Sequence, residues 1–210
     1  MIRLQRLLRL TVVAVTAVAL TGCISLFPKS KPAQLYSFGY VAPASAATPA
    51  SGETFGVMKL ANSFTRPSAG DQILTVTGGS DVAYIGQARW VAAASVLFDE
   101  AVNRAFDQSG RARLIGRGEM GKSDYVLKLI VADFKVAYDT PKARPQVVVS
   151  VHATLTRSAD RTLVAERTFA QAVPVGDNRQ TAIVAGFNTA VSGVLSDIVA
   201  WTGALGQTPA

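Results

Sequence analysis

Three consecutive segments in the second half of the chain alternate between apolar and polar residues, and this pattern constrains the fold more than any other feature. They are residues 125–138, 146–157 and 162–173. Such alternation is typical of strands with one buried face. Pro141 and Pro145 interrupt the chain between the first two segments, and a short polar turn separates the last two. Because both junctions are short, the spacing predicts an antiparallel meander.

A segment before the meander has the three-and-four spacing of an amphipathic helix. In residues 88–109 the apolar positions include Trp90, Leu97 and Phe106, while charged and polar residues occupy the opposite side. Gly110 follows at the place where a helix would stop. The pattern predicts a helix with an apolar stripe wide enough to cover a sheet.

A second helix is predicted after the meander, at residues 178–204. Its apolar stripe consists of Ile183, Phe187, Val191, Val194, Ile198 and Trp201. Asp177 and Gln180 resemble a capping box at its start. A neighbouring line of small residues would allow close approach to another backbone, and it consists of Ala182, Gly186, Ala190 and Gly193.

Short strands are predicted before the first helix, at residues 34–40, 55–60, 73–76 and 82–85. The order is therefore strands, helix, meander, helix, and each helix needs one covered face. We predict an α+β fold, a two-layer sandwich of a mostly antiparallel sheet covered by two helices. A low-complexity segment of Ala, Pro and Ser at residues 41–52 is predicted to be a flexible loop inside this domain.

The N-terminus has a different character. It begins with three arginines, Arg3, Arg6 and Arg9, and eleven apolar or near-apolar residues follow at positions 10–20. A basic region before a short apolar stretch is typical of a secretory signal peptide. A membrane-spanning helix needs about 20 apolar residues. The alternative is an uncleaved anchor, in which the apolar segment extends to Phe27.

The residues after this run resemble the lipobox of bacterial lipoproteins. In that motif a leucine stands three positions before an obligatory cysteine, and here Leu20 is followed by Thr21, Gly22 and Cys23. The resemblance implies a signal peptide at residues 1–22, cleaved between Gly22 and Cys23. It also implies a diacylglycerol on the Cys23 sulfur and an acyl chain on the new amine. Two or more acyl chains are enough for stable anchoring.

The residues after the cysteine indicate where the anchored chain would reside. Ile24, and not aspartate, follows Cys23; in bacterial lipoproteins this favours the outer membrane, with the inner membrane as the alternative. Residues 23–33 contain two prolines and two lysines and are predicted to be a lipidated tether. The domain, predicted at residues 34–206, would then lie in the periplasm, held on the periplasmic face of the outer membrane.

The charge balance excludes one class of partner. The formal net charge is +7, but three of the basic residues belong to the predicted signal peptide. The rest of the chain carries eighteen basic and fourteen acidic side chains, without a cluster of Lys and Arg interleaved with aromatic residues. We therefore predict no nucleic-acid binding. With one cysteine in the sequence, no disulfide can form within the chain.

Motifs for cofactor binding or catalysis are weak. Gly116, Gly118 and Gly121 match the pattern GxGxxG, but strand-like residues follow them, whereas a dinucleotide site needs a helix there. The single histidine, His152, is predicted on the polar side of its strand. Asp133 interrupts an apolar strand, which a bulge or a sheet edge explains more simply than an active site.

The remaining residues do not form a catalytic or metal-binding set. Asp99 and Glu100 are adjacent and point in different directions on a helix. The sequence contains no GxSxG elbow, and one histidine is too few for a histidine-based metal site. We therefore predict that the protein is not an enzyme, and we assign no catalytic residue, cofactor or metal ion.

Several stretches of the chain match motifs of a known family. They are Tyr36 in the first strand, FGVMKLANSFTRP at residues 55–67, VAYIGQARWVAAASVLFDEAVNRAF at residues 82–106, and SDYVLKLIVADFKV at residues 123–136. With the lipobox and the apolar C-terminal helix, they resemble the ABC-type transport auxiliary lipoprotein component family, the PqiC-like proteins. The resemblance covers nearly the whole mature chain.

The resemblance implies an accessory role in transport. Such lipoproteins work with an MCE-domain periplasmic protein and, through it, with an ABC permease and an ATPase, and these systems move lipids or other hydrophobic molecules between two membranes. ATP hydrolysis would belong to another subunit, and self-association of this chain is left open. The alternatives are a structural or assembly lipoprotein of the cell envelope unrelated to MCE transport, and a lipid-anchored periplasmic enzyme.

Overall fold

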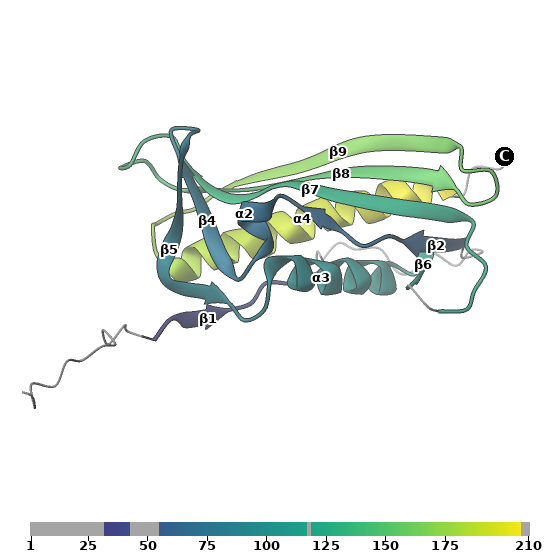
Figure 1. Cartoon of the computed structure of the whole chain (residues 1–210), viewed down its shortest axis with the longest axis horizontal. Helices are drawn as coiled ribbons and strands as arrows, with labels where there is room; N and C mark the ends of the chain where they lie inside the picture. Colours follow the sequence, from purple (N-terminus) through teal and green to yellow (C-terminus); the bar gives the residue numbers. More distant parts are fainter. Residues whose placement is uncertain (1–31, 43–54, 117–118, 207–210) are drawn as a thin grey trace, which may run out of the picture. The chain divides into compact units, whose positions relative to one another are not determined.

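The structure is a computed structural model that describes residues 32–42, 55–116 and 119–206; Figure 1 labels its helices and strands. The described residues from Ala33 onward belong to one unit. Gly22, Cys23, the predicted signal peptide, nearly all of the predicted tether and most of the predicted loop at 41–52 lie outside the described residues.

The described residues contain both strands and helices, which confirms the predicted α+β class. The strands are β1 (Gln34–Tyr36), β2 (Phe55–Lys59), β3 (Ser63–Phe64), β4 (Gln72–Thr77), β5 (Asp81–Trp90), β6 (Ala112–Ile115), β7 (Tyr125–Tyr138), β8 (Gln146–Arg157) and β9 (Leu163–Pro174). The helices are α2 (Arg66–Ala69), α3 (Ala94–Ser109) and α4 (Gln180–Gly206).

The long strand β7 organises the sheet. On one side it pairs with β8, and β8 pairs with β9, in the antiparallel meander that the sequence predicts. On its other side β7 pairs successively with β2 at Tyr125, β3 at Ile130 and β4 at Val136. β5 and β1 continue the sheet beyond β4, and β6 pairs with β2. Figure 1 shows that β4 and β5 cross the direction of β7, β8 and β9.

The prediction of a mostly antiparallel sheet is wrong, because the sheet is mixed. Of the eight pairings among the described strands, five are parallel: β1–β5, β2–β6, β2–β7, β3–β7 and β4–β7. Parallel partners need long connections, and side chains alternate in the same way in parallel and antiparallel strands. The alternation within a strand therefore does not reveal the direction of its partner.

The prediction of two helices is also wrong, since the described residues form three. The additional helix, α2, spans Arg66–Ala69 between β3 and β4. Pro67 stands in its first turn, where the missing N–H costs no helical hydrogen bond. A single turn is too short to show a helical repeat in the sequence, which explains why the pattern did not predict it.

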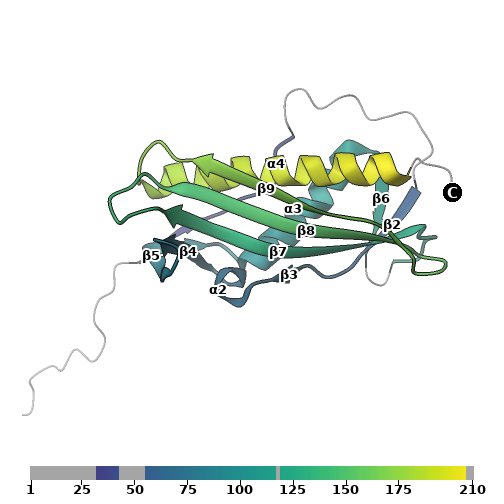
Figure 2. The same ribbon diagram turned by 90° about the horizontal axis from the view of Figure 1, so that it is seen from above.

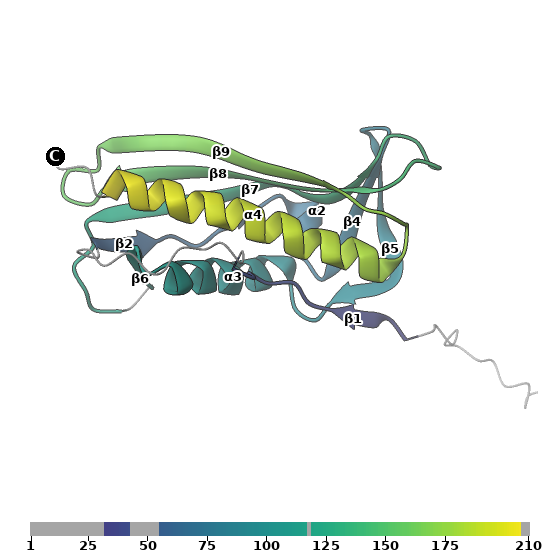
Figure 3. The ribbon, with the colours of Figure 1, turned by 180° about the vertical axis from the view of Figure 1, so that it is seen from behind.

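The two longer helices lie side by side and cover the sheet. α4 packs against β8 and β9, and α3 contacts α4 and β6. Figure 2 shows α4 running beside β9 along most of that strand, and Figure 3 shows α3 and α4 in front of the sheet. The buried stripe predicted for α4 faces this sheet, with Ile183, Phe187 and Val191 in the core.

An aromatic cluster fills the space between the helices and the sheet. The ring centroids of Trp90 and Phe187 are 5.2 Å apart, and those of Phe134 and Phe187 are 4.7 Å apart. Phe38 packs against Trp90 at 4.9 Å. All four side chains are buried. The cluster joins the segment after β1 to β5, β7 and α4.

The helix predicted at residues 88–109 begins six residues later, at Ala94. Ala88 and Trp90 belong to β5, and the N–H of Trp90 donates a 2.7 Å hydrogen bond to the carbonyl of Asp71. Trp90 is a buried residue of β5, and Ala94 begins α3. The four-residue spacing between them therefore resembles a helical repeat only by coincidence. The predicted stop is confirmed, because Gly110 caps α3 in the left-handed conformation with φ 61°.

The small residues of α4 bring the helix close to its own sheet. A Cβ added at Gly186 would lie 2.9 Å from Cγ2 of Val147 and 3.2 Å from Cγ2 of Val175. Ala190 is fully buried. The small-residue line was expected to let α4 approach another backbone closely. That approach is made within the domain, so Gly186 and Ala190 are not accessible to another protein.

Gly186→Val should destabilise the domain by about 1–3 kcal/mol, the usual cost of overpacking a filled core. The β-branched side chain of Val147 cannot move aside as a flexible chain would. Urea unfolding followed by circular dichroism measures the change. Gly86→Val is the matched control, since no atom lies within 4 Å of a Cβ added at Gly86. Equal losses in the two variants would contradict close packing at Gly186.

Among the described residues, α4 is the one helix that is long and apolar enough to suit a membrane span. Its apolar face is already occupied, because Phe187, Val191 and Leu195 are fully buried and the helix packs on β8 and β9. These contacts make α4 the core helix of the domain.

Candidate functional site

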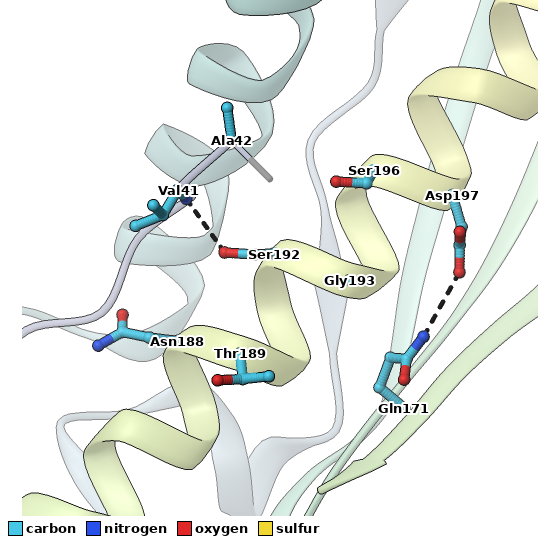
Figure 4. Close-up of a pocket in the computed structure, with 9 residues that line it drawn as sticks. All are labelled: Val41, Ala42, Gln171, Asn188, Thr189, Ser192, Gly193, Ser196 and Asp197. Carbon is cyan, nitrogen blue, oxygen red and sulfur yellow. Dashed lines mark hydrogen bonds between the residues drawn. The ribbon is translucent and has the colours of Figure 1, made fainter. Parts of the chain in front are cut away.

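A groove runs along the solvent-facing side of α4. Its volume is about 540 Å³, within the range of ligand-binding clefts. Figure 4 shows the lining residues, which are Val41, Ala42, Gln171, Asn188, Thr189, Ser192, Gly193, Ser196 and Asp197. Six of them come from α4, one from β9, and two from the segment that follows β1. Three elements distant in sequence therefore build the groove.

A polar line on α4 holds one wall of the groove in place. The N–H of Gly39 donates to Oδ1 of Asn188 at 3.1 Å, and the N–H of Val41 donates to Oγ of Ser192 at 3.0 Å. Ser196 continues this line, since residues four apart lie on the same side of a helix. Figure 4 shows the bond between Val41 and Ser192. Asn188 and Ser192 thus accept the backbone hydrogen bonds that a neighbouring strand would otherwise accept.

The segment held in this way is the end of the strand predicted at residues 34–40. β1 itself ends at Tyr36, but the predicted alternation continues, because Phe38 and Tyr40 are buried. The hydroxyls of Tyr40 and Ser196 share a hydrogen bond of 3.2 Å. The apolar side chains of this segment thus enter the core while its backbone binds α4.

The polar line was not identified from the sequence, although a signal for it exists. Asn188, Ser192 and Ser196 recur every four residues on an otherwise apolar helix. Such spacing marks a stripe of hydrogen-bonding groups. Only the fold shows that the stripe binds the backbone of residues 39–41.

The opposite wall is formed by β9. Nε2 of Gln171 donates to Oδ2 of Asp197 at 3.5 Å, and a Cβ added at Gly193 would lie 3.2 Å from Cδ of Gln171. In the part of the chain that the structure describes, β9 pairs with β8 alone. The outer side of this 12-residue strand is therefore a free edge of backbone N–H and C=O groups, directly beside the groove.

The chemistry of the groove suits binding. Its lining offers hydroxyl, amide and carboxylate groups among small side chains, and it includes no histidine, cysteine or lysine. Nucleophilic catalysis needs a nucleophile beside a general base, whereas the hydroxyls of Ser192 and Ser196 are bonded to the N–H of Val41 and to the Tyr40 hydroxyl.

His152 lies on the polar side of β8, as predicted. Its Nδ1 shares a 3.1 Å hydrogen bond with Oγ1 of Thr168, and its Nε2 lies 3.8 Å from Oε2 of Glu166. Its neighbours Val151 and Ala153 point to the opposite, buried face of the strand. His152 is therefore on the other side of the sheet from the groove.

Two of the acidic residues considered in the sequence, Asp133 and Asp99, have structural partners. The pairing of β7 with β8 shifts between Val131 and Asp133, which favours the bulge over the sheet edge as the explanation for Asp133. The Asp133 carboxylate binds Nζ of Lys135 at 2.6 Å. Oδ1 of Asp99 accepts hydrogen bonds from Nζ of Lys59 at 2.5 Å and from Nδ2 of Asn62 at 3.0 Å. Asp99 thus ties α3 to the chain around β2.

The glycine motif leads into a strand. Gly116 and Gly121 lie in the connection between β6 and β7, and Gly118 is outside the described residues. The strand β7, and not a helix, follows them, as predicted. Within the described ranges, no group of three or more His, Cys, Asp or Glu residues is placed to hold a metal ion.

The predicted capping box at the start of α4 is wrong. Oδ1 of Asp177 accepts a 2.8 Å hydrogen bond from the N–H of Arg179, and the Arg179 guanidinium binds Oδ2. The hydrogen bond from the Arg179 side chain holds the pKa of Asp177 below its ordinary value. Gln180 instead accepts from the Tyr36 hydroxyl at 3.0 Å and donates to the carbonyl of Gly86 at 3.2 Å. These contacts tie α4 to β1 and β5.

Solved structures share this fold. A protein from Xanthomonas campestris, assigned to the family DUF330, is 26% identical, with a TM-score of 0.72 over 83% of this chain and 97% of that one. An uncharacterised protein matches 82% of this chain and 99% of its own with 12% identity and a TM-score of 0.63. The hypothetical protein CT253 from Chlamydia trachomatis matches 73% and 98% with 10% identity and a TM-score of 0.53. Among curated proteins, none matches the chain significantly in sequence.

The family follows from the sequence motifs and a family model. The model described as ABC-type transport auxiliary lipoprotein component matches residues 36–199. This range includes Tyr36, both longer helices apart from the end of α4, and the whole meander. The resemblance noted in the sequence is thereby confirmed, and the chain belongs to the ABC-type transport auxiliary lipoprotein component family.

Proposed function

We propose that this protein is the auxiliary component of an MCE/ABC-type system that moves lipids or other hydrophobic molecules between two membranes. It is anchored on the periplasmic face of the outer membrane and binds an MCE-domain protein, which connects it to an ABC permease and an ATPase. The observation that carries the proposal is the match of residues 36–199 to a family of transport auxiliary lipoproteins.

The anchor in this proposal is Cys23. The signal peptide, residues 1–22, is removed after Gly22, and the Cys23 sulfur and amine carry the acyl chains. The support is the sequence from Leu20 to Cys23, which follows a basic and an apolar segment in the order of a lipoprotein signal. Residues 23–33 then serve as the tether to the domain.

The site in this proposal is the β9 edge together with the groove. An extended segment of the MCE protein adds to β9 as a further strand, which provides main-chain hydrogen bonds. Alternate side chains of that segment lie over Thr189 and Ser196 of α4, which line the groove. Edge pairing supplies affinity, and the groove supplies specificity.

Thr189→Trp should weaken this interaction at least tenfold, because the larger side chain fills the groove. Thr189 is exposed, so the substitution leaves the core unchanged. Thr181→Trp is the matched control, since Thr181 is also exposed on α4 and is not among the residues that line the groove. The measurement is titration of the domain, produced without its lipid, with the MCE protein encoded beside it.

Two results would contradict the proposal at different levels. If the folded wild-type domain and the folded MCE protein do not associate at micromolar concentrations, the accessory role in MCE transport is wrong. If the two wild-type proteins associate and the Thr189→Trp and Thr181→Trp variants bind as tightly as the wild type, the MCE protein is the partner but the docking site lies elsewhere.

A further inference from the structure

Three exposed apolar side chains belong to β1, to the residue that follows its partner strand β5, and to the first turn of the next helix, α3. Leu35 in β1 is 60% exposed, Val91 after β5 is 57% exposed, and Val96 in the first turn of α3 is 48% exposed. We call these three residues the N-terminal patch. Single exposed apolar residues are common on protein surfaces, whereas a group at one place indicates contact with another phase or molecule.

The pairing of β1 with β5 places two of these side chains together. Leu35 is opposite Arg89 in the parallel register, and the N–H of Val91 donates to the carbonyl of Tyr36 at 2.7 Å. Side chains two residues apart in an extended chain point to the same side. Arg89 and Val91 therefore share the outward side with Leu35, while Trp90 between them is buried.

The charges of the tether suit an anionic surface. Arg89 forms an ion pair with Asp71 at 2.9 Å, so this pair adds no net charge beside Leu35. Lys29 and Lys31 precede β1 by a few residues, and the first acidic residue of the sequence is Glu53. Basic residues beside a membrane anchor are attracted to anionic lipid head groups.

The length of the tether limits the distance between the N-terminal patch and the membrane in which Cys23 is anchored. Ala33 lies ten positions after Cys23, and a chain of this length reaches at most about 36 Å when fully extended. A short tether gives the domain a high effective concentration at the surface to which it is attached. A small apolar patch is then sufficient, although it would not hold an unattached domain on a bilayer.

We propose that the N-terminal patch rests in the head-group layer of the membrane to which Cys23 is anchored. The inference depends on the lipid anchor in the proposed function. The bilayer is the occupant that the position favours, because the patch begins in the strand that directly follows the tether, and the tether carries Lys29 and Lys31. In this orientation the turn between β8 and β9, at the opposite end of the sheet from β1 (Figures 1 and 3), is directed away from the membrane.

The test uses the full-length lipidated protein in vesicles of phosphatidylethanolamine and phosphatidylglycerol. Leu35→Cys carries an environment-sensitive NBD fluorophore, and the lipidated Cys23 has no free thiol to compete for the label. Leu163→Cys is the matched control, since Leu163 is 57% exposed and begins β9 beside the β8–β9 turn. The readouts are the emission wavelength and quenching by lipids that carry nitroxide groups.

We expect a blue-shifted emission at position 35 and quenching several-fold stronger than at position 163. Adding Val91→Asp to the Leu35→Cys protein should reverse both effects. Equal quenching at the two positions, or no quenching at position 35, would overturn the orientation while leaving the anchor intact. If the unlabelled wild-type protein does not float with the vesicles, the lipid anchor is wrong and the orientation falls with it.

Discussion

Cys23→Ser should abolish acyl attachment and release the protein from the membrane. The lipobox cysteine provides the sulfur to which diacylglycerol is linked, and serine offers no thiolate. Each buried methylene contributes about 0.8 kcal/mol, and stable anchoring needs two chains, so the loss should be nearly complete. Incorporation of radiolabelled palmitate and fractionation of the cell envelope measure the two effects, and an unprocessed precursor or a soluble product is expected.

Ser25→Ala is the control for this experiment. It lies two residues after Cys23 and leaves Leu20 to Cys23 unchanged, so normal labelling and membrane retention are expected. If Cys23→Ser is still trimmed before position 23 and remains in the membrane fraction, the apolar N-terminal segment is not a lipoprotein signal. The uncleaved anchor would then be the better interpretation.

Phe187→Ala should lower the free energy of unfolding by about 3–5 kcal/mol, the usual cost of deleting a buried aromatic ring. The ring is fully buried, and it packs against Trp90 at 5.2 Å and Phe134 at 4.7 Å. Its removal leaves a cavity at the point where α4, β5 and β7 meet. A loss of this size approaches the whole net stability of an ordinary domain, and urea denaturation of the variant measures it.

His152→Ala is the matched control on the other face of the sheet. The side chain is 37% exposed, so the free energy of unfolding should change by no more than about 0.5 kcal/mol. Transport should also be unchanged in this variant. A stable His152→Ala protein that loses transport would favour the catalytic alternative, and a stable Phe187→Ala protein would contradict the packing described for α4.

The local pattern was a good guide wherever partners are neighbours in the chain. The three strands of the meander were predicted correctly, because β7, β8 and β9 pair in sequence order across short connections. The burial of Phe187 and the stop at Gly110 were also predicted, since a helical stripe and a left-handed cap depend on residues within a few turns.

Local sequence patterns predicted less of the candidate site. The small-residue line of α4 was recognised, but its partner is the sheet of the same domain at Val147. The groove depends on the approach of residues 39–41 to Asn188 and Ser192, about 150 positions away. No periodicity within either segment encodes that contact.

The sequence by itself determined the elements whose signal is local: the meander, the buried face of each long helix, and the lipobox prediction at Cys23. Only the tertiary structure decided that β2, β3 and β4 run parallel to β7, that Trp90 reaches the core from a strand, and that β9 pairs on one side only among the described strands, beside a groove. Side-chain period reports which face of an element is buried. Which strand pairs with which is decided by packing between segments distant in the sequence. This choice does not alter the side-chain period within a strand.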